Sequence, residues 1–68
     1  MRLRRDPTME ARVLWVMEEH GEDTLPKLAS LCGYSYTQMR RMLNLLVGEG
    51  SAYVRQRSGR RLYGRTEI

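Results

Sequence analysis

Arginine side chains are the groups in this 68-residue chain with the clearest capacity for chemistry, and they are unevenly placed. Two stand side by side at Arg40 and Arg41, and five more fall between residues 55 and 65. Residues 35–68 contain seven basic and two acidic residues, a net charge of +5, whereas residues 1–34 have a net charge of −1. Such segregation is typical of one face that meets a polyanion, and nucleic acid is the commonest polyanion for a compact basic domain.

Length and composition limit the class of protein. A length of 68 residues is enough for one domain at most. We therefore expect a single domain over residues 1–68, with flexible tails at 1–5 and 66–68. No apolar run approaches the roughly 20 residues that span a bilayer, and the basic start is not followed at once by the apolar stretch of a secretory signal. One cysteine cannot form an internal disulfide, which favours a reducing, cytoplasmic setting.

Two amphipathic helices are expected in the first half. The first begins at Asp6-Pro7, with Thr8 as a competing cap, and ends at Gly21. At about 100° per residue, its apolar stripe contains Met9, Val13, Val16, Met17 and His20, and Leu14 widens it. Thr24 is expected to cap the second helix, whose buried side would contain Leu25, Leu28, Ala29 and Leu31.

A third helix is expected over residues 35–48. Ser35 and Gln38 have the spacing of a capping box, and Gly48 and Gly50 are expected to end the helix. Its apolar stripe contains Met39, Met42, Leu43 and Leu46, with Tyr36 at the edge. The opposite side is polar and cationic.

Residues 53–65 show a hairpin pattern around Ser58-Gly59. A two-residue turn would pair Val54 with Tyr63, whereas a longer loop would shift that register, and the sequence leaves the choice open. Because a lone hairpin is unstable in water, we expect it to pack on the helices through Val54, Tyr63 and Leu62.

The order of these elements, and the string LPKLASLCGYSYTQMRRML, resemble the winged helix-turn-helix family. Ala29 matches the small residue at which two helices cross, Gly33 the turn glycine, and Met39 an apolar position of the second helix; other apolar matches are Leu25, Leu28, Cys32, Tyr34 and Met42. The chain is most similar to small single-domain regulators such as the MarR-like and pilus-operon regulators. The resemblance implies an α+β, mainly α fold, with three helices and a C-terminal β-hairpin wing.

Five residues on the polar side of the third helix are predicted to contact DNA: Thr37, Gln38, Arg40, Arg41 and Asn44. Arginine can bind guanine, and glutamine or asparagine can bind adenine, through two hydrogen bonds in the major groove. We hypothesise that Arg41, Gln38 and Asn44 read bases, while Arg40 and Thr37 contact phosphate. The alternative interpretation is a solvated helix face.

The hairpin supplies a second set of predicted DNA contacts: Arg55, Arg57, Ser58, Arg60 and Arg61. A slim tip flanked by arginines suits the DNA backbone or a narrow minor groove, where the potential is most negative. Helix and hairpin would project from the same side of the domain. Neutralising about four to six phosphates would give a slope of about −4 to −5 for log affinity against log salt. The alternative is a hairpin that serves only solubility.

Trp15 lies off the apolar stripe of its helix. It either packs against the start of the chain, for example on Leu3, or forms a dimer contact. Two copies would raise specificity, because one module of this size covers only about 600–1,000 Å² of DNA interface.

The remaining polar residues are interpreted structurally. His20 and Cys32 do not form a metal set, so His20 is a helix-terminal residue and Cys32 a small buried one, with redox sensing the less favoured alternative. The acidic cluster of Glu18, Glu19, Glu22 and Asp23 is interpreted as a solvated face away from DNA that could repel DNA or meet a basic partner.

The sequence therefore predicts sequence-specific binding of double-stranded DNA by a small transcriptional regulator, with a homodimer as a further expectation. No nucleophile motif, phosphate-binding glycine loop or metal spacing is present, so we predict no enzyme activity, no cofactor and no small-molecule substrate. One alternative is a winged-helix adaptor that binds protein, although an adaptor would more often have an apolar third helix. Another is shape-based binding of RNA or an unusual duplex.

Overall fold

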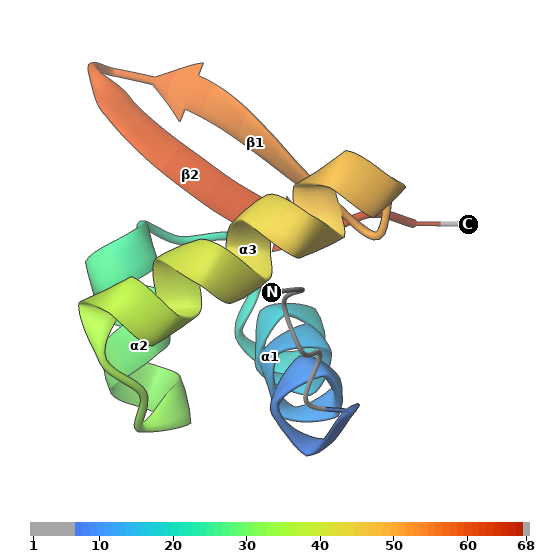
Figure 1. Cartoon of the computed structure of the whole chain (residues 1–68). Helices are drawn as coiled ribbons and strands as arrows, with labels where there is room; N and C mark the ends of the chain where they lie inside the picture. The colour runs from blue at the N-terminus through green and yellow to red at the C-terminus, as the bar shows by residue number, and fades with distance from the viewer. Residues whose placement is uncertain (1–6, 68) are drawn as a thin grey trace.

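The computed structural model describes residues 7–67, which form three helices followed by a hairpin (Figure 1). The elements are α1 (Pro7–His20), α2 (Leu25–Cys32), α3 (Tyr36–Glu49), β1 (Ala52–Arg57) and β2 (Arg60–Arg65). The predicted architecture, mainly helical with a C-terminal two-stranded wing, is confirmed. The proposed cap at Asp6, the contact with Leu3 and the tails at 1–5 and 68 lie outside the described residues.

A single apolar core joins the helices to the base of the hairpin. Its largest fully buried side chains are Leu28, Met39, Leu43, Leu46 and Val13. The predicted stripes are confirmed with two exceptions, because His20 is exposed and Leu31 is 43% exposed. The buried residues of α2 are at positions 25, 28, 29 and 32, a spacing that places them on one face of the helix. Leu31 lies outside that face.

Helix ends follow the local sequence closely. Ser35 Oγ accepts a hydrogen bond from the Gln38 N–H at 3.1 Å, and Gln38 Oε1 accepts one from the Ser35 N–H at 2.9 Å, so the capping box is confirmed. The predicted end at Gly48 is wrong by one residue, since Gly48 lies within α3 and Gly50 takes the left-handed conformation at φ 85°. Thr24 occupies the N-cap position of α2, but its side chain makes no capping hydrogen bond.

The hairpin has the two-residue turn, and the register that pairs Val54 with Tyr63 is observed. Ser58 and Gly59 both have positive φ, 52° and 76°, as a type I′ turn requires. The expected packing of Val54 is wrong, because its side chain is 41% exposed. Ala52 and Tyr63 are buried instead, since only the end of the hairpin nearest α3 reaches the core.

A backbone bridge fixes the hairpin to the loop between α1 and α2. The Asp23 N–H donates to the Tyr63 carbonyl at 3.1 Å, and the Tyr63 N–H donates to the Asp23 carbonyl at 2.8 Å. β2 therefore lies between β1 and residue 23. In Figure 1 the hairpin extends beyond the helices, and its tip lies on the same side of the view as the N-terminal half of α3.

Candidate nucleic-acid interface

The exposed side of α3 carries all five of the helical residues predicted to contact DNA. Thr37, Gln38, Arg40, Arg41 and Asn44 are exposed, whereas Met39, Met42, Leu43 and Leu46 on the other side are buried. Because the buried side anchors the helix in the core, the polar side is presented in a fixed orientation. The structure thus brings these residues together on one surface.

Gln38 has a structural task as well. Its Oε1 accepts the Ser35 N–H in the capping box, which leaves the Nε2 amide group for other partners. Reading adenine through two hydrogen bonds needs both the oxygen and the amide nitrogen. Gln38 can therefore donate to a base in its observed position, but paired recognition would require it to leave the cap.

Tyr36 adds an aromatic group to this surface that the sequence pattern assigned only to the edge of the apolar stripe. Its side chain is 56% exposed at the first residue of α3. Residues four apart lie on one face of a helix, so Tyr36 is aligned with Arg40 and Asn44.

The hairpin has two distinct faces, because residues directly opposite each other on paired strands share a face. Ala52 and Tyr63 mark the face toward the core; Gln56 and Arg61 lie on the same side of the hairpin but near its tip, where both are exposed. The other face, the outer wing face, carries Tyr53, Arg55, Arg57, Arg60, Leu62 and Gly64. The predicted contacts are therefore divided: Arg55, Arg57 and Arg60 lie on the outer wing face, Arg61 lies on the opposite face, and Ser58 lies in the turn.

Arg57 and Arg60 stand directly opposite each other on the outer wing face, immediately before and after the turn. Like charges in such a pair destabilise a hairpin unless an anion lies between them. Within residues 7–67, no ion pair joins either of them to a carboxylate, and the same holds for Arg40, Arg41 and Arg61. These five guanidinium groups are available to an external anion.

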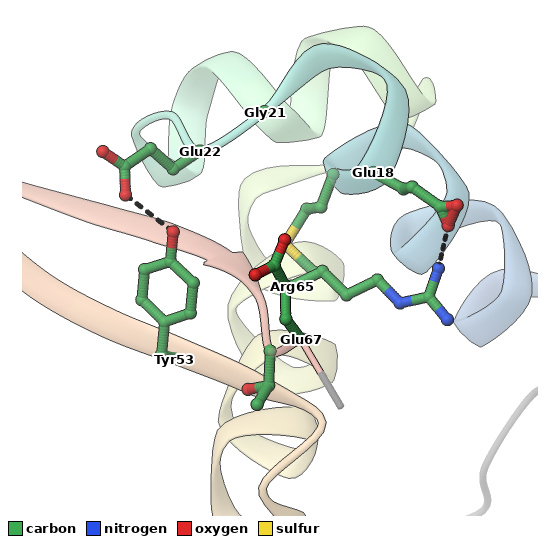
Figure 2. A pocket seen from close by; sticks show the side chains of 8 residues that line it. Glu18, Gly21, Glu22, Tyr53, Arg65 and Glu67 are labelled. Carbon is green, nitrogen blue, oxygen red and sulfur yellow. Dashed lines mark hydrogen bonds and ion pairs between the residues drawn. The ribbon is translucent and has the colours of Figure 1, made fainter.

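Arg55 differs from its neighbours because it forms an ion pair with Glu22. The Tyr53 hydroxyl donates to the other carboxylate oxygen of Glu22 at 2.8 Å, and Figure 2 shows this phenol directed at Glu22. The hydrogen bond from Arg55 and then that from Tyr53 lower the pKa of Glu22, and the charges of Arg55 and Arg57 act in the same direction. Glu22 is therefore ionised at neutral pH and offsets positive charge on the outer wing face.

A second ion pair joins the end of the wing to α1. Arg65 donates to Glu18 (Figure 2), and a groove between the two elements is lined by Met17, Glu18, Gly21, Glu22, Tyr53, Arg65, Thr66 and Glu67. The interpretation of the acidic cluster as a solvated face therefore needs correction. Glu18 and Glu22 bind arginines of the hairpin, because the chain fold places the end of α1 and the following loop beside β2.

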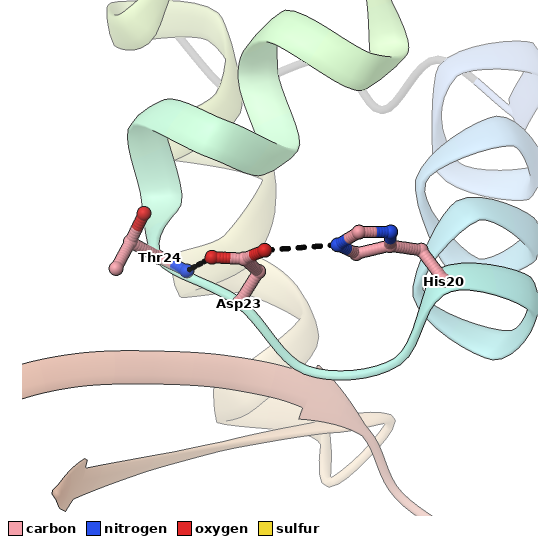
Figure 3. Close-up of polar contacts among 3 residues, drawn as sticks. All are labelled: His20, Asp23 and Thr24. Carbon is pink, nitrogen blue, oxygen red and sulfur yellow. Dashed lines mark hydrogen bonds and ion pairs between the residues drawn. The ribbon is translucent and has the colours of Figure 1, made fainter.

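The loop that carries Glu22 is itself held by Asp23 (Figure 3). One oxygen of Asp23 lies 2.8 Å from His20 Nε2, and the other accepts the Thr24 N–H at 2.7 Å. The hydrogen bond from His20 and then that from Thr24 lower the pKa of Asp23. His20 thus acts as the helix-terminal residue expected from the sequence, and in the described part of the chain no group of three or more acidic, histidine or cysteine side chains could hold a metal ion.

Cys32 and Trp15 lie away from these contacts. Cys32 is buried, and burial raises the pKa of its thiol, which disfavours the reactive thiolate. Trp15 is 62% exposed on the outer side of α1. No helix between residues 7 and 67 is both long enough and apolar enough to cross a membrane.

Comparisons with known proteins agree with this architecture. The Zalpha domain of PKZ from Carassius auratus, solved in complex with Z-DNA, superposes with a TM-score of 0.77 at 14% identity, over 87% of this chain and 94% of that domain. A MarR family transcriptional regulator from Silicibacter pomeroyi superposes with a TM-score of 0.82 at 28% identity, over 90% of this chain. Human N-acetylserotonin methyltransferase, in complex with SAM, matches with a TM-score of 0.63 at 16% identity.

The chain spans only 43% of the MarR regulator and 26% of the methyltransferase. No protein-family model and no curated protein matches the sequence. Three helices, a C-terminal hairpin and these structural matches define a winged helix-turn-helix fold of the kind that DNA-binding proteins use. The predicted resemblance is confirmed at this level.

Proposed function

We propose that this protein binds double-stranded DNA sequence-specifically, as a small cytoplasmic transcriptional regulator. The observation that carries the proposal is the set of five guanidinium groups that no carboxylate of residues 7–67 pairs with, two on α3 and three around the wing tip. The structural neighbours support it, since one is a MarR family transcriptional regulator and another was solved with Z-DNA bound.

In this proposal α3 lies in the major groove. Arg41 and Asn44 contact base edges, Gln38 donates through its amide group, and Arg40 and Thr37 contact phosphates. Tyr36 joins this surface at the start of the helix, where its ring and hydroxyl can meet the sugar-phosphate backbone.

The wing meets the backbone or the minor groove beside the helix. Arg57 and Arg60, which oppose each other across the strands, form a cradle for one phosphate, because an anion between them removes their mutual repulsion. Arg61 and the Ser58 turn supply further contacts.

We also propose that two copies act together through Trp15. A single module has a small interface, and two copies on an inverted repeat would place their α3 helices about 34 Å apart. An exposed tryptophan is the residue type most often found at the energetic centre of a protein interface.

Selection of bound sequences from a random duplex pool, at about 0.15 M salt, tests the proposal. We expect enriched half-sites, arranged as a repeat if two copies bind. The Arg41→Ala, Asn44→Ala double variant should lose the enrichment and keep general duplex binding. Tight binding without enrichment would instead favour recognition of duplex shape, including a left-handed duplex. Absence of duplex binding would favour the protein-binding adaptor.

A further inference from the structure

We propose that Glu22 is a positioning residue for the wing: it holds the hairpin against the helices and keeps Arg55 from binding DNA phosphates, which restrains binding to nonspecific DNA. This inference rests on the proposed function. It gives a role in binding to an acidic residue that is not itself predicted to contact DNA.

The contacts of Glu22 reach two residues that are distant in sequence. Its carboxylate accepts the Tyr53 hydroxyl, 31 residues away, at 2.8 Å and binds Arg55, 33 residues away. The side chain of Glu22 is only 20% exposed, whereas that of Arg55 is 51% exposed. The side chain of Glu22 is therefore the better covered partner of this ion pair.

Backbone geometry explains why Glu22 reaches the outer wing face. Asp23 pairs with Tyr63, whose side chain points to the core, and neighbouring residues in an extended segment point to opposite faces. Residue 22 therefore projects toward the face that carries Tyr53 and Arg55. Tyr53 in turn lies over Gly64, where a Cβ would come within 2.5 Å of its hydroxyl oxygen.

The electrostatic consequence follows from the shared face. Arg55 lies on the same side of the hairpin as Arg57 and Arg60, which are proposed to bind a phosphate. An Arg55 released from Glu22 would therefore add a third guanidinium group to these two. In the absence of DNA, the carboxylate of Glu22 neutralises the charge of Arg55. Each additional phosphate contact steepens the dependence of log affinity on log salt by about 0.9.

Two variants with the same change in net charge test the inference. Glu22→Gln keeps an oxygen that can accept the Tyr53 hydrogen bond but loses the charge that binds Arg55. Glu19→Gln removes an exposed carboxylate of α1 that forms no ion pair with the described hairpin residues. Affinity for a labelled random-sequence duplex is measured by fluorescence anisotropy at several salt concentrations.

For Glu22→Gln we expect nonspecific affinity to rise about three- to tenfold and the salt slope to steepen by about one, while Glu19→Gln changes neither by as much. Adding Arg55→Ala to Glu22→Gln should abolish the gain, which separates release of Arg55 from a general change of charge. Equal behaviour of Glu22→Gln and Glu19→Gln would overturn the inference, and so would a gain that survives Arg55→Ala.

Hydrogen exchange of the free protein tests the holding of the wing without DNA. We expect the amides of Arg55 and Leu62 to exchange faster in Glu22→Gln than in Glu19→Gln, while amides of α3 are unchanged. Equal exchange in both variants would contradict this half of the inference. If the wild-type protein binds no duplex, the proposed function and the DNA-binding half of the inference are both overturned. If the wild-type protein binds duplex but Glu22→Gln and Glu19→Gln have the same affinity and salt slope, only the inference is overturned.

Discussion

The ring of Tyr53 occupies the space that a side chain at residue 64 would need. A Cβ built on Gly64 would lie 2.5 Å from the Tyr53 hydroxyl oxygen and 2.6 Å from the ring carbon that bears it. Gly64 therefore lets the phenol cross the strand and reach Glu22, and the constraint on this glycine is close approach rather than positive φ.

Replacement of Gly64 by alanine should displace Tyr53 and break its hydrogen bond to Glu22. We expect a loss of about 1–2 kcal/mol in the free energy of unfolding, measured by urea denaturation. Gly48→Ala is the matched control, because Gly48 lies within α3 with nothing within 4 Å of its Cβ position. That change should stabilise the protein by about 0.5–1 kcal/mol. A stabilising Gly64→Ala would show that the phenol does not need this space.

Arg41→Ala should weaken binding to a selected site by about 1–3 kcal/mol and relax the base preference at one position. The physical reason is the loss of two hydrogen bonds to one base edge. Arg12→Ala on α1 removes the same charge from an exposed helix position outside the proposed interface. Competition assays with duplexes that differ at single base pairs measure both the affinity and the base preference. Equal losses of affinity in Arg41→Ala and Arg12→Ala would show that Arg41 contributes only through its charge.

Gln38→Glu separates the capping role of this residue from its proposed role in DNA binding. A carboxylate can still accept the Ser35 N–H and interacts favourably with the N-terminus of α3, so the midpoint of thermal unfolding should be equal or higher. DNA affinity should fall at least tenfold, about 1.4 kcal/mol, because the amide donor is lost and a negative charge faces the duplex. Unchanged affinity would place Gln38 in the cap alone.

Trp15→Ala should convert a dimer into a monomer if the proposed contact exists. Sedimentation velocity, with and without a duplex that carries an inverted repeat, measures the change in mass. Leu31→Ala is the control, since Leu31 is another exposed apolar residue on a different helix. An unaltered sedimentation pattern for Trp15→Ala would exclude Trp15 from the dimer interface.

The lowered pKa of Glu22 makes its contribution dependent on pH. The folded state favours the carboxylate, so the stabilisation is present above the ordinary value of 4.5 and is lost as pH falls through the lower folded-state pKa. The difference in unfolding free energy between wild type and Glu22→Gln should therefore shrink between roughly pH 5 and pH 2. Asp23 keeps its own acid sensitivity in both proteins. Parallel curves over this range would show that ionisation of Glu22 does not stabilise the folded state.

Local patterns in the chain were sufficient for most of the fold. The capping box at Ser35, the buried stripe through Met39 and Leu43, and the position of the hairpin turn at Ser58 each depend on residues a few positions apart, whereas the length of that turn was left to the structure. Such features follow from backbone conformation and helical or strand periodicity, which the sequence determines by itself. The position of the polar side of α3 follows in the same way, because it is the side that the apolar stripe leaves exposed.

Only the tertiary structure decided how the charges are shared. Arg55 was predicted to contact DNA alongside Arg57 and Arg60, and Arg65 belongs to the same arginine-rich stretch, yet Arg55 and Arg65 bind Glu22 and Glu18 across 33 and 47 residues. These pairs exist because the Asp23 bridge aligns the loop after α1 with β2, and no short-range pattern encodes that alignment. For the same reason Ala52 rather than Val54 anchors the hairpin, since burial depends on how far the helical core extends along the strands.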